Sequence, residues 1–215
     1  VNIEVYYHKD HAWNVDRMIE SVQDSIDYYT QAFGPYQHRQ LRIIEFPKYR
    51  SFAQSFANTV PYSESMGFIT DLRDESKVDL PYYVTAHEVA HQWWGHQVSG
   101  ANVEGSAVIS ESLSQYSALM VLKKRFGAEK LRKFLKYELD RYLMGRTGEA
   151  FEEMPLYKTQ SQQYLHYNKG SVAMMAIYDR LGEERLNAAL KAFLNEYKYQ
   201  STPYPTTLDL LSYLK

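Results

Sequence analysis

The chain has 215 residues, 45% of them apolar, and a formal net charge of −2 from 24 basic and 26 acidic residues. This length is sufficient for one large domain with a buried core, so residues 1–215 are predicted to form a single domain. The balanced charge offers no basic stripe for nucleic acid, and the absence of cysteine excludes disulfides and thiolate metal ligands.

Strand-like patterns dominate the first third of the chain. A helix is predicted from an N-cap at Asn14 to about Phe33, where Gly34-Pro35 follows. The apolar residues of this helix recur at helical spacing. Alternation or richness in β-branched and aromatic residues predicts four strands: residues 1–8, 41–46, 51–60 and 66–70.

Helical patterns dominate the rest of the chain. Pro81 occupies a favoured first-turn position and opens a helix that contains residues 87–91. Loops are predicted at 99–106 and 145–163 because these stretches are polar. Further helices are predicted at 108–126, 128–144, 167–181, 183–198 and 206–214. Because strands come first and helices afterwards, the order favours an α+β fold, a small N-terminal β-sheet followed by a mainly helical part.

His87, Glu88 and His91 form the pattern H-E-x-x-H. Histidines four residues apart lie on one face of a helix and can offer two imidazole nitrogens to one zinc ion. Glu88 lies about 100° round the helix from His87, so it can stay off the metal and act as a general base. The alternative is a surface helix whose sequence matches the H-E-x-x-H pattern by chance. The apolar neighbours indicate a buried helix, where unpaired imidazoles and carboxylates are costly, and this favours the metal.

A third ligand has two candidates further along the chain, Glu104 and Glu111. Glu104 lies in the predicted loop at 99–106, where its backbone is poorly fixed, and its other reading is a solvated charge. Glu111 opens an apolar helix that anchors it against the core. Because metal ligands need rigid support, Glu111 is the preferred ligand.

Together, HEVAHQWWGHQV and the later ISESLSQYSAL resemble the aminopeptidase N family of zinc metallopeptidases, which are gluzincins with a thermolysin-like catalytic domain. Residues 110–116, SESLSQY, match the family's N-E-G-F-A-S-Y motif loosely. The resemblance therefore implies one zinc ion per chain, held by His87, His91 and Glu111. The 19 residues between His91 and Glu111 are one more than is usual in the family.

Two further motifs of this family have counterparts in the chain. Residues 61–70, PYSESMGFIT, stand where the family has G-A-M-E-N followed by W-G-L-I-T, which implies that Glu64 holds the free α-amino group of the substrate. Residues 167–170, YNKG, match Y-x-K-G in full, which implies that Tyr167 donates a hydrogen bond to the developing oxyanion. The other readings are a strand-end charge for Glu64 and one more of 20 tyrosines for Tyr167. His166 is predicted either to line the cleft or to be structural.

The resemblance implies zinc-dependent hydrolysis of peptide bonds, with Glu88 and Tyr167 as catalytic residues and Glu64 as the residue that makes the enzyme an aminopeptidase. A zinc endopeptidase stays open as an alternative. So does a non-catalytic domain that binds peptides or partner proteins and regulates a transporter.

The amino-acid sequence around the zinc motif resembles most the subgroup in which a peptidase-like domain is fused to a bacterial ABC-transporter permease. That resemblance implies a domain on the extracytoplasmic face of the inner membrane, tethered by membrane helices outside residues 1–215. The start at Val1, inside a strand-like run, fits a domain excised from a longer chain. Without such a tether the cytoplasm is the expected location. A peptide is the expected partner, nucleic acid is not, and the sequence does not predict an oligomeric state.

Overall fold

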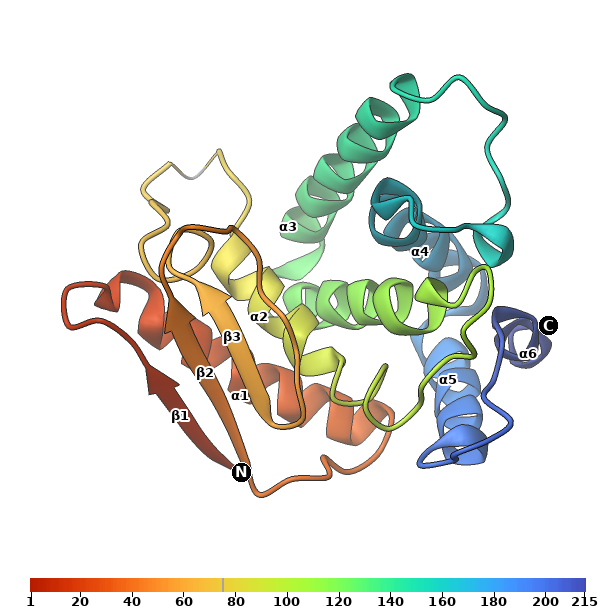
Figure 1. The fold of residues 1–215 in the computed structure, drawn as a ribbon, viewed down its shortest axis with the longest axis horizontal. Coiled ribbons are helices and arrows are strands. Elements are labelled where there is room, and N and C mark those ends of the chain that lie inside the picture. The colour runs from red at the N-terminus through yellow and green to blue at the C-terminus, as the bar shows by residue number, and fades with distance from the viewer. Residues whose placement is uncertain (75) are drawn as a thin grey trace.

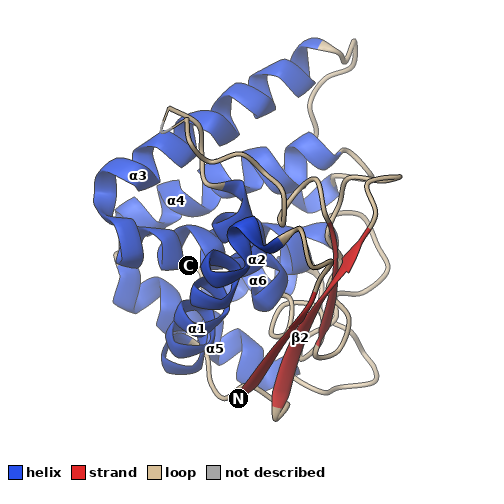
Figure 2. Ribbon diagram, turned by 90° about the vertical axis from the view of Figure 1, so that its left-hand side faces the viewer, coloured by secondary structure: helices blue, strands red, loops and turns tan. Residues whose placement is uncertain are grey.

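The computed structural model of the protein describes residues 1–74 and 76–215. A small three-stranded sheet lies along one side of a helical body (Figures 1 and 2). The strands β1 (Asn2–Tyr6), β2 (Gln40–Phe46) and β3 (Thr59–Ser63) lie in the order β1-β2-β3 and are all parallel. Helix α1 (Val15–Ala32) connects β1 to β2. The chain therefore begins with a βαβ unit. The predicted elements already had this order, but the parallel pairing of the strands was not predicted, and the mixture of sheet and helix is as expected.

The register of the sheet aligns its apolar residues into one face. Val5 stands opposite Ile43, and Ile43 stands opposite Val60. Leu41, Ile43 and Val60 are buried, because successive side chains of a strand point to opposite faces and theirs point toward the helices. This face packs against α1 and α2 (Leu80–Ala90), as the side view in Figure 2 shows.

The two strands predicted at 51–60 and 66–70 are wrong. Residues around Ala53 and Phe56 make isolated antiparallel bridges to β3, and β3 itself covers Thr59–Ser63, which includes part of the expected connection. Val60 and Tyr62 of β3 alternate with Pro61 and are buried. Pro61 has no backbone N–H, so it donates no hydrogen bond within the sheet. Residues 66–70 form turns, in which Phe68 is buried without strand pairing.

Asn14 stands at the N-cap position of α1, but its side chain does not cap the helix. Its amide instead donates to the carbonyl oxygens of Gly67 at 2.7 Å and Thr70 at 2.9 Å. The side chain is buried under these turns, so satisfying their carbonyl groups takes precedence over the exposed N–H groups of the helix.

The regular secondary structure after β3 is helical in the described ranges, as predicted. The longer helices are α3 (Leu113–Thr147), α4 (Gly170–Leu181), α5 (Glu183–Tyr197) and α6 (Thr207–Tyr213). Gly127 interrupts α3 with φ +82°, so the break predicted there is confirmed. Short helical turns are η1 (Ala12–Asn14), η2 (Val108–Ser112), η3 (Leu156–Lys158) and η4 (Tyr164–Lys169). Within the described ranges, no helix is both long and apolar enough to cross a membrane.

Helix α2 lies in the centre of the molecule. It packs against α1 on one side and against the first half of α3 on the other (Figure 1). Asp79 caps its start by accepting from the backbone N–H of Tyr82 at 3.2 Å, and Pro81 lies in its first turn, as predicted. Polar side chains on the last turns of α2 are therefore enclosed by protein, and they need partners there.

Candidate metal centre

His87, His91 and Glu111 come together at the end of α2 and form what we call the metal centre. The Nε2 atoms of the two histidines lie 3.0 Å apart, and Glu111 Oε2 lies 3.3 Å from each of them. Ligands held at about 2.0–2.1 Å by a tetrahedral zinc ion stand about 3.3–3.4 Å from one another. The three donor atoms thus have the spacing of three corners of a zinc tetrahedron.

The hydrogen bonds behind His91 fix its tautomer. Nδ1 of His91 lies 3.0 Å from the carbonyl oxygen of Trp94 and 3.1 Å from Ser114 Oγ. A carbonyl oxygen only accepts, so Nδ1 carries the proton and Nε2 of the neutral ring keeps its lone pair for a metal. Among the described residues, Nδ1 of His87 has no partner, so nothing there prevents the same tautomer.

The charges of the metal centre also suit a cation. Burial works against the ionised form of Glu111, but the imidazoles of His87 and His91 outweigh it and hold the pKa of this carboxyl well below its usual range. Burial likewise opposes protonation of His91, and Glu111 beside it nevertheless raises the pKa of His91 to about 9, so a metal ion bound at Nε2 would displace a proton from that nitrogen. A buried carboxylate thus keeps its charge and attracts a positive group between the two rings.

Two departures from regular helix bring the ligands together. Helix α2 ends at Ala90, so His91 is its C-cap, and the chain turns away through Trp93 and Trp94, both fully buried. Glu111 lies in η2, which is a π-helical turn. A π-helical turn contains one residue more than an α-helical turn, which offers a structural account of the extra residue between His91 and Glu111. Such turns often occur at functional sites.

Glu88 is buried beside the metal centre without belonging to the ligand set. A hydrogen bond from the backbone of Ser55 reaches its carboxylate, and both histidines and Glu111 act on its charge. Burial raises its pKa above the usual value, although His87 and His91 pull it down. A carboxylate with raised proton affinity next to a metal is suited to accept a proton.

Tyr167 approaches the metal centre from η4, the second π-helical turn. Its ring centroid lies 5.7 Å from that of His87, and its hydroxyl lies beside the Glu111 carboxylate. Burial, together with the charge of Glu111, raises the pKa of Tyr167 far above its usual range. The phenol therefore stays protonated and can donate a hydrogen bond.

Gly170 explains how η4 can come so close to η2. A Cβ atom added at Gly170 would lie 2.3 Å from Ser112 Oγ, so only glycine fits there. Ser112 Oγ in turn donates to the carbonyl oxygen of His166 at 2.6 Å. The Tyr167 and Glu111 segments are thus joined back to back, and the glycine of the YNKG motif has a packing role.

The structure does not bring Glu64 to the metal centre. Its carboxylate lies 3.6 Å from Nδ1 of His11, which also contacts Glu45, and it accepts from the backbone N–H of Lys48 at 3.2 Å. We call His11, Glu45 and Glu64 the sheet-end cluster, because the two glutamates stand at the carboxyl ends of β2 and β3.

The length of β3 separates these two groups. The bridge between Phe56 and Thr59 places Ser55, which contacts Glu88, beside Val60. Glu64 comes four residues after Val60, which corresponds to about 13 Å along a strand. The role predicted for Glu64 at the substrate's amino group stays a prediction.

Glu104, His96 and His166 lie outside the ligand set, and each has identifiable surroundings. Glu104 accepts from Gln160 at 3.3 Å in an exposed loop, away from the two ligand histidines. His96 Nε2 lies 3.2 Å from the carbonyl oxygen of Ser55, which fits a structural role. His166 is buried near Glu111, and burial lowers its pKa.

Several groups around the metal centre were missing from the sequence-based prediction. Ser114 could have been found, since it follows Glu111 by three residues on the same helical face. Ser55 and the Trp94 carbonyl act through the backbone or across long sequence separations, and no local pattern marks them.

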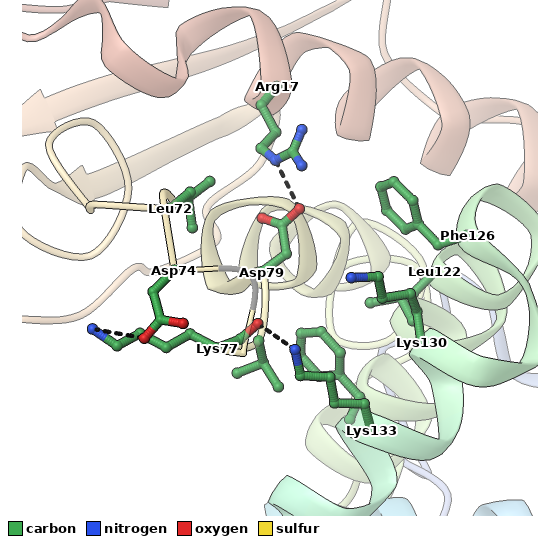
Figure 3. Close-up of a pocket in the computed structure, with 11 residues that line it drawn as sticks. Arg17, Leu72, Asp74, Lys77, Asp79, Leu122, Phe126, Lys130 and Lys133 are labelled. Carbon is green, nitrogen blue, oxygen red and sulfur yellow. Dashed lines mark hydrogen bonds and ion pairs between the residues drawn. The ribbon is translucent and has the colours of Figure 1, made fainter.

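A pocket of about 310 Å³ lies at the opposite end of α2, between α1, the chain before α2 and α3 (Figure 3). Figure 3 shows Arg17 paired with Asp79, and Lys133 donating to the backbone carbonyl of Lys77, among its lining residues. Asp79 is the N-cap of α2, so His87 lies eight residues further along the helix, about 12 Å away. None of the predicted site residues lines this pocket.

Comparison with known proteins identifies relatives for almost the whole chain. Residues 17–215 match the model of the peptidase family M1 domain. "Probable aminopeptidase 1" of Sulfurisphaera tokodaii is 26% identical over 85% of this chain and 24% of its own length. Endoplasmic reticulum aminopeptidase 2 of Homo sapiens is 22% identical over 94% of this chain and 22% of its own length. The chain thus spans about a quarter of the length of these curated relatives.

The fold has similar solved structures. The crystal structure of an M1 zinc metallopeptidase from Deinococcus radiodurans superposes with a TM-score of 0.64 at 20% identity, over 94% of this chain and 40% of that one. At this identity the likeness shows the fold alone. It extends over both the sheet and the helical part, so the elements that position the metal centre have counterparts there.

Proposed function

Since this chain belongs to peptidase family M1, we propose that it hydrolyses peptide bonds with a zinc ion at the metal centre, and that its preferred substrates are peptides with a free N-terminus. The observation that carries the proposal is the convergence of His87, His91 and Glu111 with the spacing of zinc ligands. Glu88 and Tyr167 adjoin this centre, so a base and an oxyanion donor accompany the ligands.

The donor set fits zinc better than a hard cation. Two imidazole nitrogens and one carboxylate oxygen are typical of a catalytic zinc site, which takes three protein ligands and keeps a fourth position open. Zinc held there would polarise the scissile carbonyl and make water acidic enough to act as a nucleophile near neutral pH.

Glu88 is the proposed general base. Its burial and raised pKa favour taking a proton from the attacking water, and the same carboxyl group can then give that proton to the leaving amine. The Ser55 backbone holds the carboxylate in place from the side of β3. Because Glu88 lies outside the ligand set, its protonation leaves all three proposed ligands in place.

Tyr167 is the proposed oxyanion donor. Its phenol remains protonated, and its position beside Glu111 and His87 puts it next to the metal. Such a donor strengthens its hydrogen bond as negative charge develops on the carbonyl oxygen. Removing one donor of this kind costs about 10²–10³ in kcat.

The preference for a free N-terminus rests on relatives rather than on a residue of this chain. Both relatives named above are called aminopeptidases. Another structure of the Deinococcus enzyme is described as bound to a Tyr-Ser-Ala substrate, which is a short peptide. The role of Glu64 as the residue that holds the amino group stays a prediction from the motif at residues 61–70.

The decisive experiment compares the purified protein with its Glu88→Gln variant. Zinc content is measured by elemental analysis, and hydrolysis is followed on one peptide in free and N-acetylated form. We expect both proteins to hold one zinc ion per chain and only the parent to cleave. Equal rates on free and acetylated peptide would indicate an endopeptidase. A zinc-loaded parent that cleaves neither peptide would contradict the proposed function and favour a non-catalytic binding domain.

The thermolysin-like character of the domain, its tether to a transporter permease and its extracytoplasmic location stay predictions from the resemblance. They are supported only by the amino-acid sequence around the zinc motif. Protease accessibility of the full-length protein in intact spheroplasts tests the location: cleavage from outside is expected, and protection until lysis would contradict it.

A further inference from the structure

Glu138 is a buried carboxyl group that the proposed chemistry does not use. It lies on α3 beyond the break at Gly127, and only 2% of its surface is exposed. A carboxyl group in this position is costly unless other groups hydrogen-bond to it. Its partners therefore indicate why it is there.

Two side-chain amides point at the same oxygen of Glu138. Asn168 Nδ2 donates to Oε2 at 2.6 Å, and Gln115 Nε2 lies 3.5 Å from the same atom. The hydroxyl of Tyr83 donates to Oε1 of Gln115 at 2.8 Å and completes the network. Tyr83, Gln115 and Asn168 are themselves buried, so the network is enclosed by protein.

Each of these partners is next to a residue of the proposed site. Tyr83 precedes His87 by four residues on α2, and Gln115 follows Glu111 by four residues. Asn168 directly follows Tyr167 in η4. A single carboxylate from outside the site thus connects the three segments that carry its ligands and its oxyanion donor.

The contact with Asn168 is the shortest and matters most, because η4 is a π-helical turn. Such a turn is less stable than an α-helical one and needs tertiary contacts to persist. Tyr164 and Lys169 of η4 also bond to carboxylates, those of Glu149 and Glu153 in the chain after α3. Asn168 differs from them because its side chain donates to a buried carboxylate on α3 itself. Loss of the anchor would let the Tyr167 hydroxyl move.

We propose that Glu138 is a positioning residue, whose carboxylate anchors Asn168 and thereby holds the Tyr167 hydroxyl at the metal centre. This inference rests on the proposed function in so far as Tyr167 is its oxyanion donor. Both amides contact Oε2 of Glu138, and hydrogen bonds to an ionised carboxylate are stronger than those to a neutral carboxyl or amide oxygen. The anchor is therefore strongest in the ionised form.

The surroundings of Glu138 set the pH at which the anchor forms. Burial raises its pKa to about 7, although the Asn168 hydrogen bond and the charge of Arg141 work in the opposite direction. Tyr83 from α2 is the titratable group that faces it across the network, and its own pKa is raised by burial and by Glu138. The proposal thus predicts that the Tyr167 contribution to kcat fades as the pH falls below about 7.

The test compares Glu138→Gln with the matched control Glu129→Gln, which removes one charge from an exposed position of the same helix. Glu138→Gln should keep zinc and KM, and should lower kcat by about 10–100-fold, the range typical of lost supporting contacts. The pH dependence of kcat near neutrality should weaken in this variant. Glu129→Gln should behave as the parent.

A double-mutant cycle shows whether Glu138 acts through Tyr167. In a Tyr167→Phe background, Glu138→Gln should have little further effect on kcat, because the group that it positions is gone. The same fold-loss in both backgrounds, or an unchanged kcat in the single variant, would overturn the proposal. If Glu138→Gln does not fold, Asn168→Ala tests the same anchor from the other side and should reproduce the loss.

Amide hydrogen exchange gives a readout independent of turnover. Residues 164–169 should exchange faster in Glu138→Gln than in Glu129→Gln, with little difference in α1. Unaltered exchange there would refute the anchor even in an active enzyme. A zinc-loaded parent without peptidase activity would instead contradict the proposed function, and the exchange result would still decide whether Glu138 anchors η4.

Discussion

The metal centre and the sheet-end cluster are both built from histidine and glutamate side chains. They differ in whether the nitrogen and oxygen atoms of these side chains already have hydrogen-bond partners. In the sheet-end cluster each carboxylate already accepts a backbone N–H, from His8 at 2.5 Å to Glu45 and from Lys48 at 3.2 Å to Glu64. His11 contacts both of them directly. The metal centre has two imidazole nitrogens facing each other at 3.0 Å. Uncommitted lone pairs, more than residue types, therefore distinguish a metal site from an ion-pair cluster.

The largest expected effect tests whether zinc binds at the metal centre and not at the sheet-end cluster. One donor side chain is removed from each group. Glu111→Ala should lose the zinc ion, because two imidazoles alone leave a zinc site one ligand short. His11→Ala should keep one zinc ion per chain, since the sheet-end cluster is satisfied without metal. Elemental analysis after dialysis measures both. Glu104→Ala is a second control, and loss of zinc from that variant would move the third ligand to the loop.

A nearly complete loss of turnover without loss of metal is expected for Glu88→Gln. The amide cannot accept a proton, and general bases contribute about 10²–10⁴-fold to rate. Steady-state cleavage of a free-amino peptide, together with zinc analysis of the same sample, measures this. Unchanged activity in a zinc-loaded variant would remove Glu88 from the mechanism.

Tyr167→Phe should reduce kcat by about 10²–10³, the scale of one lost oxyanion donor, with little change in KM. The hydroxyl interacts with charge that exists only in the transition state, so ground-state binding should not depend on it. Full kinetics on one peptide separate the two parameters. A rise in KM at constant kcat would assign Tyr167 to substrate binding instead.

The convergence of His87, His91 and Glu111 was predictable from the sequence, because local geometry governs most of it. The spacing of His87 and His91 follows from one helical turn, and the preference for Glu111 over Glu104 follows from the rigidity of a helix compared with a loop. The structure brings these three residues together as expected. The break in α3 at Gly127 was also predictable, because it depends on the backbone conformation of one glycine.

Features that depend on distant contacts were not predictable. The pairing of residues around Ala53 with β3 is set by the register of the sheet, and the composition of 51–60 alone suggests a strand of its own. Glu138 lies 27 residues after Glu111, beyond a helix break, and a glutamate in a helix is usually exposed. Its role becomes visible only when Asn168 is placed beside it.

A smaller effect is expected from removing the imidazole of the sheet-end cluster. Only 7% of the Glu45 side chain is exposed, so His11→Ala leaves a mostly buried carboxylate with one partner fewer. The expected loss is about 1–2 kcal/mol in the free energy of unfolding, below the full value for a charged hydrogen bond because the Glu45 contact to the His8 N–H remains. Urea unfolding near pH 7 measures it. A stability equal to that of the parent would mean that solvent replaces His11 at no cost.

The smallest effect is expected from Glu64→Ala, and it tests whether the sheet-end cluster belongs to the substrate site. A carboxylate that pairs with the ammonium group of a substrate would make free-amino peptides react faster than acetylated ones, and its loss would erase that ratio. Glu64 is instead paired with His11 and lies about 13 Å along β3 from the level of Ser55. We therefore expect the ratio of kcat/KM for free and acetylated peptide to be the same in Glu64→Ala and in the parent. The ratio is a better measure than either rate, because a general loss of stability affects both substrates alike. If Glu64→Ala abolishes the ratio while zinc content and cleavage of the acetylated peptide persist, the motif match at residues 61–70 would be the better guide, and β3 would have to shift in the working enzyme to bring Glu64 to the substrate.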